Sequence, residues 1–120
     1  MLTEIGKELR KLRIDRNEKM IEMAKKLDKS PAFISAVETG KKTPPPGIED
    51  IVIRLYGLVG EAAHRVRMAA DRSRNAFVLH PSNMLGRDTA GLMARRMNSL
   101  SSADLEEIRQ ILARGAKPNE

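Results

Sequence analysis

The fold is decided by residues 20–42, MIEMAKKLDKSPAFISAVETGKK. Apolar residues recur there at intervals of three and four, over Ile21–Leu27 and again at Ile34 and Val37, which predicts two short helices with one buried face each. Between them, Asp28 can take the left-handed conformation that a sharp corner needs. The stretch therefore predicts two helices joined by a tight turn.

The second of these helices has recognisable ends. Ser30 can accept a backbone N–H as an N-cap, and Pro31 suits the first turn because it has no N–H to satisfy. Gly40 can end the helix in a left-handed conformation. Ile34 and Val37 then face inward, with Phe33 beside them. The residues left on the outer face are Ala32, Ser35, Ala36 and Thr39. Two helices joined by so short a turn form a helix-turn-helix.

Helical patterns also flank this segment. Residues 3–16 predict a first helix with Thr3 as its N-cap. After the lysine pair, residues 43–47 (TPPPG) cannot be helical, because consecutive prolines force extended geometry on the residues before them. Residues 48–57 predict a further helix that Gly57 can end. The expected inward residues of the two flanking helices are Ile5, Leu9, Leu12, Ile48, Ile51, Val52 and Leu55.

A further helix, which we expect to lead away from the helix-turn-helix motif, is predicted over residues 61–75. Its inward residues would be Ala62, Ala63, Val66, Ala69 and Ala70. Its outward arginines fit either a solvated helix face or an additional stripe of phosphate contacts. These arginines are Arg65, Arg67, Arg72 and Arg74.

The remaining chain predicts a short arm. Residues 76–80 (AFVLH) are β-prone but too short for a stable sheet alone, so a strand there would need a partner. Residues 87–98 predict a helix, and Ser101 with Asp104 resembles a capping box that opens a last helix. The expected buried residues of these two helices are Leu92, Met93, Met97, Leu105, Ile108 and Leu112. Residues 115–120 are interpreted as a disordered tail.

Composition narrows the function classes. The net charge of +6 favours a polyanionic partner. With one tyrosine and two phenylalanines, the chain lacks the aromatics of a single-strand stacking platform, so duplex DNA is the better target. There is no cysteine, no apolar run of membrane-spanning length and no apolar leader, which favours a cytoplasmic protein.

No chemistry of catalysis is indicated. His64 and His80 have no second His or Cys at a metal-binding spacing. No nucleophile has a recognisable base and oxyanion-hole setting, and no glycine-rich phosphate loop occurs. We therefore expect neither enzyme activity nor a cofactor nor a metal site.

Residues 3–58 resemble the xenobiotic-response-element family of helix-turn-helix regulators, which includes lambdoid phage repressors and Cro. The motifs are IGKELRKLRIDR, IEMAKKLDKSPAFISAVETGK and GIEDIVIRLYGL. The resemblance implies a structural ion pair between Arg13 and Glu38. It also implies base-edge contacts from the positions of Ala32, Phe33 and Ala36, and phosphate contacts from other residues near the end of the recognition helix. The candidate DNA-binding residues are Ser30, Pro31, Ala32, Phe33, Ser35, Ala36, Thr39, Lys41 and Lys42.

The chain departs from that family at the opening of its second helix and on its reading face. Lys19 and Met20 stand where the family usually has a Thr or Ser cap and a Gln that contacts the DNA backbone. The reading face carries alanines, which cannot make the bidentate hydrogen bonds that distinguish guanine or adenine. Such a face can touch thymine methyl groups, and Ser35 adds one small donor and acceptor.

Taken together, the sequence predicts an all-α protein. Residues 1–75 would form a five-helix repressor-like domain, and residues 76–114 a helical extension, with room for one short strand, that serves dimerisation or partner binding. The stretch LMARRMNSLSSADLEEIRQIL resembles such extensions in the same family. The expected function is a dimeric repressor that binds an inverted-repeat operator in double-stranded DNA at its own or a neighbouring promoter. The alternative is an antitoxin or adaptor whose carboxy-terminal arm binds a protein.

Overall fold

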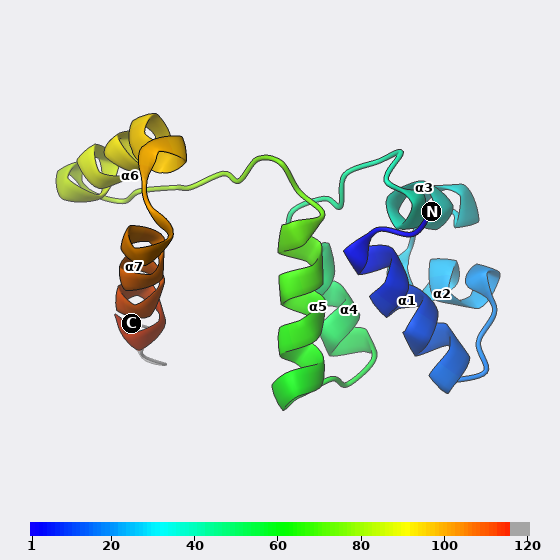
Figure 1. Cartoon of the computed structure of the whole chain (residues 1–120). Coiled ribbons are helices and arrows are strands. Elements are labelled where there is room, and N and C mark those ends of the chain that lie inside the picture. The colour runs from blue at the N-terminus through cyan, green and yellow to red at the C-terminus, as the bar shows by residue number, and fades with distance from the viewer. Residues whose placement is uncertain (116–120) are drawn as a thin grey trace. The chain divides into compact units, whose positions relative to one another are not determined.

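A computed structural model describes residues 1–115, and within them the protein is all-α, as predicted, with no strand. Figure 1 shows the helices in chain order. They are α1 (Glu4–Asp15), α2 (Met20–Leu27), α3 (Pro31–Thr39), α4 (Ile48–Leu55), α5 (Gly60–Arg72), α6 (Met84–Arg96), the short 3-10 turn η1 (Met97–Ser99) and α7 (Ser102–Gly115). The chain divides into two compact units, the first over Met1–Phe77 and the second beginning at Val78.

The core of the first unit is built from α1 to α5. α1 packs against both α3 and α5, and α4 packs against α2 and α5. Its buried apolar residues are Ile5, Leu9, Met23, Ala24, Leu27, Ile34, Val37, Val52, Tyr56, Val66, Ala69 and Ala70. The helix expected over residues 61–75 is α5, and it packs against α1 and α4. Small side chains on the inner face of α5 let its axis approach α1 closely, so α5 belongs to this core.

Local capping chemistry fixes the ends of α1, α2 and α3 as expected. The Thr3 hydroxyl accepts the Gly6 N–H at 3.0 Å. Asp28 ends α2 in the left-handed conformation, with φ 54°. The Ser30 hydroxyl accepts the Phe33 N–H at 3.0 Å, and Gly40 ends α3 with φ 83°. These turns set the direction in which α3 leaves α2.

Two apolar residues expected in the core lie outside it. Ile21 is 59% exposed and Leu55 is 42% exposed. α4 ends at Leu55, and its inward line is Ile48, Val52 and Tyr56, one residue every four. Tyr56, which follows the helix and is 2% exposed, takes the core place expected for Leu55.

The second unit has an open structure. α6 begins at Met84, three residues before the expected start, because the Asn83 side chain accepts the Gly86 N–H at 2.7 Å. The Ser101 hydroxyl caps α7 by accepting the Asp104 N–H at 3.0 Å. The extended segment 76–82 forms no strand, and neither α6 nor the described length of α7 contains a buried residue.

The expected burial of Leu92, Met97, Leu105 and Leu112 is therefore wrong, and Met93 and Ile108 are only half-buried. Two helices and one extended segment offer each other too little surface to enclose an apolar side chain. Gly115, expected in the tail, is the last residue of α7, and residues 116–120 of the expected tail lie outside the described residues. In the described part of the chain, no helix has the length and apolar character to cross a membrane.

Candidate nucleic-acid interface

α3 separates its side chains into a buried face and an outer face. Ile34, Val37 and Glu38 are buried. The predicted contact residues lie on the opposite side, where Pro31, Ala32, Ser35 and Thr39 are exposed and Ala36 is half-buried. The outer face is therefore a surface of small side chains, on which helix backbone and methyl groups can approach another molecule closely.

The end of α3 is held to α1 by a buried ion pair. Both Nη atoms of Arg13 from α1 donate to the carboxylate of Glu38 from α3, and Arg13 Nη2 lies 3.1 Å from Glu38 Oε1. Arg13 Nη1 also donates to Met23 Sδ in α2 at 3.3 Å. One arginine thus links three helices, which fixes the orientation of α3 relative to the rest of the unit.

Gly6 brings the backbone of α1 against the same end of α3, and the sequence reasoning missed it. A Cβ atom at Gly6 would lie 2.9 Å from the Glu38 Cα and closer still to the Glu38 carbonyl oxygen. That carbonyl also accepts the Thr3 N–H at 2.9 Å and the Thr3 hydroxyl at 3.1 Å. A glycine within the otherwise regular helical pattern of residues 5–16 was the available indication.

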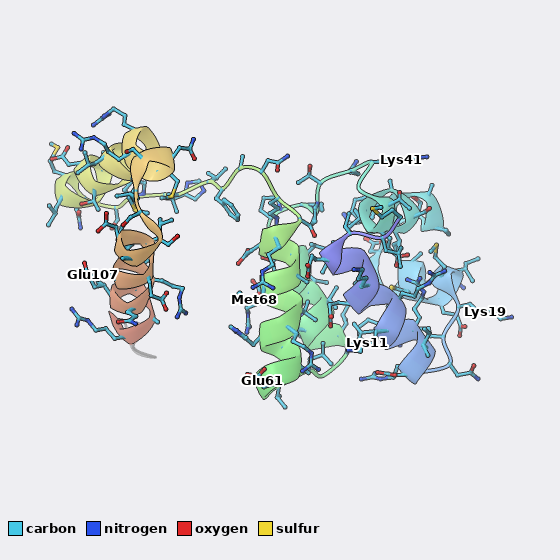
Figure 2. All side chains as sticks on the ribbon, viewed as in Figure 1. Lys11, Lys19, Lys41, Glu61, Met68 and Glu107 are labelled. Atoms are coloured by element: carbon cyan, nitrogen blue, oxygen red, sulfur yellow. The ribbon has the colours of Figure 1, made fainter. Side chains whose placement is uncertain are left out.

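The basic pair after α3 lies on a constrained loop. Lys41 and Lys42 are both exposed, and Figure 2 shows the Lys41 side chain extending outward from the loop that follows α3. The Lys42 N–H donates to the Ala36 carbonyl at 3.0 Å, so the loop backbone is tied to the last turns of the helix. The two ammonium groups are therefore presented from a fixed backbone.

Two lysine ammonium groups lie near the ring of Phe33, in the first turn of α3. Lys42 Nζ lies 5.4 Å from the centre of its ring and Lys29 Nζ lies 5.2 Å from it, both within the range of cation–π attraction. Lys29, in the turn before α3, was not among the predicted contact residues. The Phe33 ring is half-buried, and these two cations lie beside it. This favours a role for Phe33 in positioning the lysines rather than in contacting bases directly.

The hydroxyl groups of α3 differ in what they can offer a phosphate. Thr39 Oγ1 donates to the Ser35 carbonyl at 2.9 Å, so its proton is already used within the helix. Ser30 Oγ only accepts a bond, from the Phe33 N–H, and keeps its own proton free. Of the two, Ser30 is the better donor to an anion.

The opening of α2 is also basic. Lys19 is the N-cap residue, but its ammonium has no lone pair with which to cap a backbone N–H. Instead Glu22 Oε1 accepts the Lys19 N–H at 2.9 Å, which leaves the Lys19 side chain to extend outward as Figure 2 shows. An exposed lysine thus lies next to Met20, the position at which the resemblance implies a contact with the DNA backbone.

A polar cluster holds the α1–α2 corner against the end of α4. The Glu18 carboxylate accepts bonds from the Tyr56 hydroxyl and from Lys26, and Arg16 Nη2 donates to the Tyr56 carbonyl at 2.7 Å. Burial and the neighbouring Glu18 carboxylate raise the pKa of Tyr56. Burial alone would raise the pKa of Glu18, but the bonds from Lys26 and Tyr56 outweigh it and lower that pKa.

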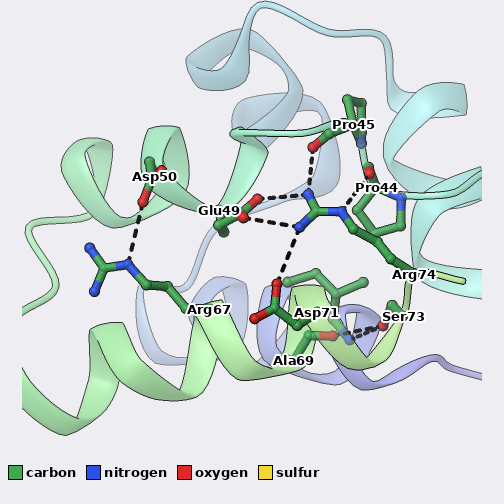
Figure 3. Close-up of polar contacts among 10 residues, drawn as sticks. Pro44, Pro45, Glu49, Asp50, Arg67, Ala69, Asp71, Ser73 and Arg74 are labelled. Carbon is green, nitrogen blue, oxygen red and sulfur yellow. Dashed lines mark hydrogen bonds and ion pairs between the residues drawn. The ribbon is translucent and has the colours of Figure 1, made fainter. Parts of the chain in front are cut away.

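The Arg74 side chain is buried against the proline residues that follow the lysine pair, as Figure 3 shows for Pro44 and Pro45. It was expected on an exposed arginine stripe, and this expectation is wrong because its side chain is only 7% exposed. Its two Nη atoms lie 2.7 and 3.0 Å from the Glu49 carboxylate oxygens. These bonds lower the pKa of Glu49 despite its partial burial. The other three outer arginines of α5 are exposed.

The structure thus brings together the outer face of α3, the two lysines after it and Lys29 before it, on a unit fixed by a buried ion pair. No protein-family model, no curated protein and no solved structure matches the chain. The geometry and charge of this surface are therefore the indications of its function.

Proposed function

We propose that the chain is a sequence-specific regulator that binds double-stranded DNA, with α2 and α3 as its helix-turn-helix and α3 as the recognition helix. The observation that carries the proposal is the exposed face of α3, which is free of acidic residues and has exposed lysines in the segments before and after it, Lys29, Lys41 and Lys42. The major groove is wide enough to admit a helix, and lysines beside that helix would meet the phosphates along the groove edge.

The reading face favours contact with methyl groups and with DNA shape. Ala32 and Ala36 offer only methyl groups, whose favourable base partner is the thymine methyl. Ser35, exposed between them, has one hydroxyl for a base edge. With so few hydrogen-bonding groups, part of the sequence preference would come from how easily each operator deforms.

We propose further that the protein acts as a dimeric repressor. A two-fold dimer would place its recognition helices in successive major grooves of an inverted repeat, with half-site centres about 34 Å apart. The second unit supports this because α6 and α7 leave large apolar side chains exposed, among them Leu85, Leu92 and Leu112. A second copy of the chain would cover such a surface. Occupancy of a promoter by the dimer would occlude it.

The alternative, an antitoxin or adaptor, rests on one observation. The second unit has an open hollow lined mainly by apolar groups of the extended segment and α6, including Leu79, Pro81, Leu85 and Met93. A helix or strand of another protein would fit there. A stable complex with one other protein, formed in place of self-association, would favour this alternative.

Selection of bound fragments from random duplexes, followed by salt titration, tests the proposed function. Lys41→Ala and Lys42→Ala should each weaken binding to selected and random duplexes alike and lower the salt slope by about one. Ala36→Gln should change sequence preference and leave the salt slope nearly unaltered, because it adds a long amide to the reading face.

Lys11→Ala is the matched control, because it removes the same charge from an exposed position of α1. It should alter the slope less than either loop variant. The recognition helix would have to be sought elsewhere if the loop variants changed preference while Ala36→Gln weakened both duplexes equally. Failure to enrich any sequence would remove the claim of specific recognition.

A further inference from the structure

The loop that follows the lysine pair has few backbone donors to hold it in place. Residues 44–46 are three consecutive prolines, which have no N–H to donate. Their carbonyl oxygens still accept. The Ile48 N–H donates to that of Pro45 at 3.2 Å, and Arg74, two residues after α5, donates to those of Pro44 and Pro45. Arg74 Nε lies 3.0 Å from the Pro44 carbonyl oxygen, and Arg74 Nη2 lies 2.6 Å from that of Pro45.

The same guanidinium also binds α4 and the last turn of α5. It bonds to both carboxylate oxygens of Glu49, and its Nη1 lies 3.6 Å from an Asp71 oxygen. Figure 3 shows these contacts around the Arg74 guanidinium. The rigid planar fork of an arginine can meet several acceptors in fixed directions, which a lysine ammonium on a flexible stem cannot do.

A second ion pair between α5 and α4 serves as an internal comparison. Arg67 Nε lies 3.4 Å from an Asp50 carboxylate oxygen, also drawn in Figure 3. Arg67 is 54% exposed, and no loop carbonyl is bonded to it. Arg67 lies within α5 and Arg74 two residues after it, and both bind carboxylates in the first turn of α4. Of the two, Arg74 bonds to the proline loop.

We propose that Arg74 is a positioning residue for DNA binding, which holds the loop after Lys41 and Lys42 so that the two ammonium groups meet phosphates. Arg74 does not itself contact DNA, because its side chain is buried within the unit. This inference rests on the proposed function. It deepens that function, because it makes Arg74, about thirty positions after the lysine pair in the chain, responsible for where the two lysines lie.

Charge reinforces the argument from geometry. Glu49 lies in the first turn of α4, close behind the proline loop, and an unpaired carboxylate there would repel the phosphate backbone. Arg74 neutralises it at hydrogen-bond distance. Loss of Arg74 would therefore free the loop and also uncover a negative charge beside it.

The first measurement needs no DNA. Trypsin cleaves after lysine, so the rate of cleavage between Lys42 and Thr43 in the full chain reports how often the loop opens. We expect about tenfold faster cleavage there in Arg74→Gln and in Arg74→Lys, since glutamine loses the charged donor and lysine loses the planar fork that meets both proline carbonyls and Glu49. Arg67→Gln, which removes the same charge from a residue that also pairs with α4, should be cleaved at the wild-type rate.

The second measurement is the salt titration of duplex binding by the same variants. Arg74→Lys keeps the net charge, yet its affinity for selected and random duplexes should fall by about tenfold and its salt slope by one to two. Arg67→Gln should lose no more than about threefold, the effect of one distant charge. If Arg74 contributed only to stability, its substitution would lower the unfolding midpoint and leave the salt slope of the folded fraction unchanged.

The outcomes separate this inference from the proposed function. Equal resistance to trypsin in Arg74→Gln and wild type, or a rise in cleavage shared by every lysine and arginine site, would overturn the inference. So would wild-type DNA binding by Arg74→Lys. If Arg74→Gln does not fold, Arg74→Lys decides the question. A wild-type chain that binds no duplex would overturn the proposed function and the DNA part of this inference, while the cleavage rates would still show whether Arg74 orders the loop.

Discussion

At the scale of single residues, Gly6 matters because of the side chain it lacks. Its Cα faces the Glu38 backbone, which cannot rotate away as a side chain could. Gly6→Ala should therefore destabilise the protein by about 1–3 kcal/mol through overpacking, although alanine is the better helix former. Urea unfolding followed by circular dichroism would measure this loss.

The same substitution at Gly91 is the matched control. A Cβ there would meet only the guanidinium end of Arg95 at 3.6 Å, in ordinary van der Waals contact. Gly91→Ala should stabilise α6 by up to about 1 kcal/mol through helix propensity. Equal effects at the two glycines would show that α1 does not approach the end of α3 as described.

Residue-level prediction from sequence succeeded where the cause was local. Asp28, Ser30 and Gly40 take their expected conformations because turns and caps depend on neighbours within a few residues. Arg74 could not be assigned in this way. Its acceptors lie 25 to 30 residues earlier in the chain, and only the packing of α5 brings them within reach.

At the scale of elements, the carboxylates that join helices should make the first unit sensitive to acid. The pKa values of Glu18 and Glu49 are both lowered from their ordinary value of 4.5 in the folded chain. The native state then binds fewer protons than the unfolded state, so stability is present above about pH 4.5 and is lost as the pH falls below it.

We expect the urea midpoint of the wild-type chain to decline as the pH falls from 4.5 toward 3. Glu49→Gln should be less stable at pH 7 and should decline less steeply, because the titrating group is gone. Glu61→Gln, at an exposed position in the first turn of α5, should follow the wild-type curve. Parallel curves for Glu49→Gln and wild type would contradict the linkage.

Element boundaries followed from sequence better than element contacts did. The spacing of Ile48, Ile51, Val52 and Leu55 located α4, but the choice between Leu55 and Tyr56 as its last inward residue depends on the helix ending at Leu55. Likewise, the alanine-rich face of α5 indicated burial without indicating its partner. Periodicity shows that a face is covered, whereas the covering element is set by tertiary packing.

At the scale of the whole molecule, the two units should depend differently on protein concentration. The first unit has a buried core, whereas no residue is buried in α6 or in the described part of α7. A chain cut after Asn75 should remain folded, sediment as a monomer and bind its operator more weakly, because the surface proposed to join two copies is gone. A truncated chain that still sediments as a dimer would remove that role from the second unit.

A point substitution in the full chain refines this test. Leu112→Asp places a charge on the exposed apolar side of α7 and should lower the dimer fraction as truncation does. Glu107→Ala, at an exposed position away from that side, should sediment as the wild type does.

The all-α class was predictable from periodicity throughout, whereas the openness of the second unit was not. Its spacing indicates amphipathic helices whether their apolar sides are covered or exposed.

Tyr56 gives the chain a built-in optical probe. The sequence contains one tyrosine and no tryptophan, and that tyrosine is buried in the first unit, where its hydroxyl donates to Glu18. Near-ultraviolet absorbance and tyrosine emission therefore report on the first unit, whereas far-ultraviolet circular dichroism sums the helices of both units. If the second unit melts separately, the two spectroscopic curves will not coincide. Unlabelled protein is thus enough to assign each thermal transition to its part of the chain.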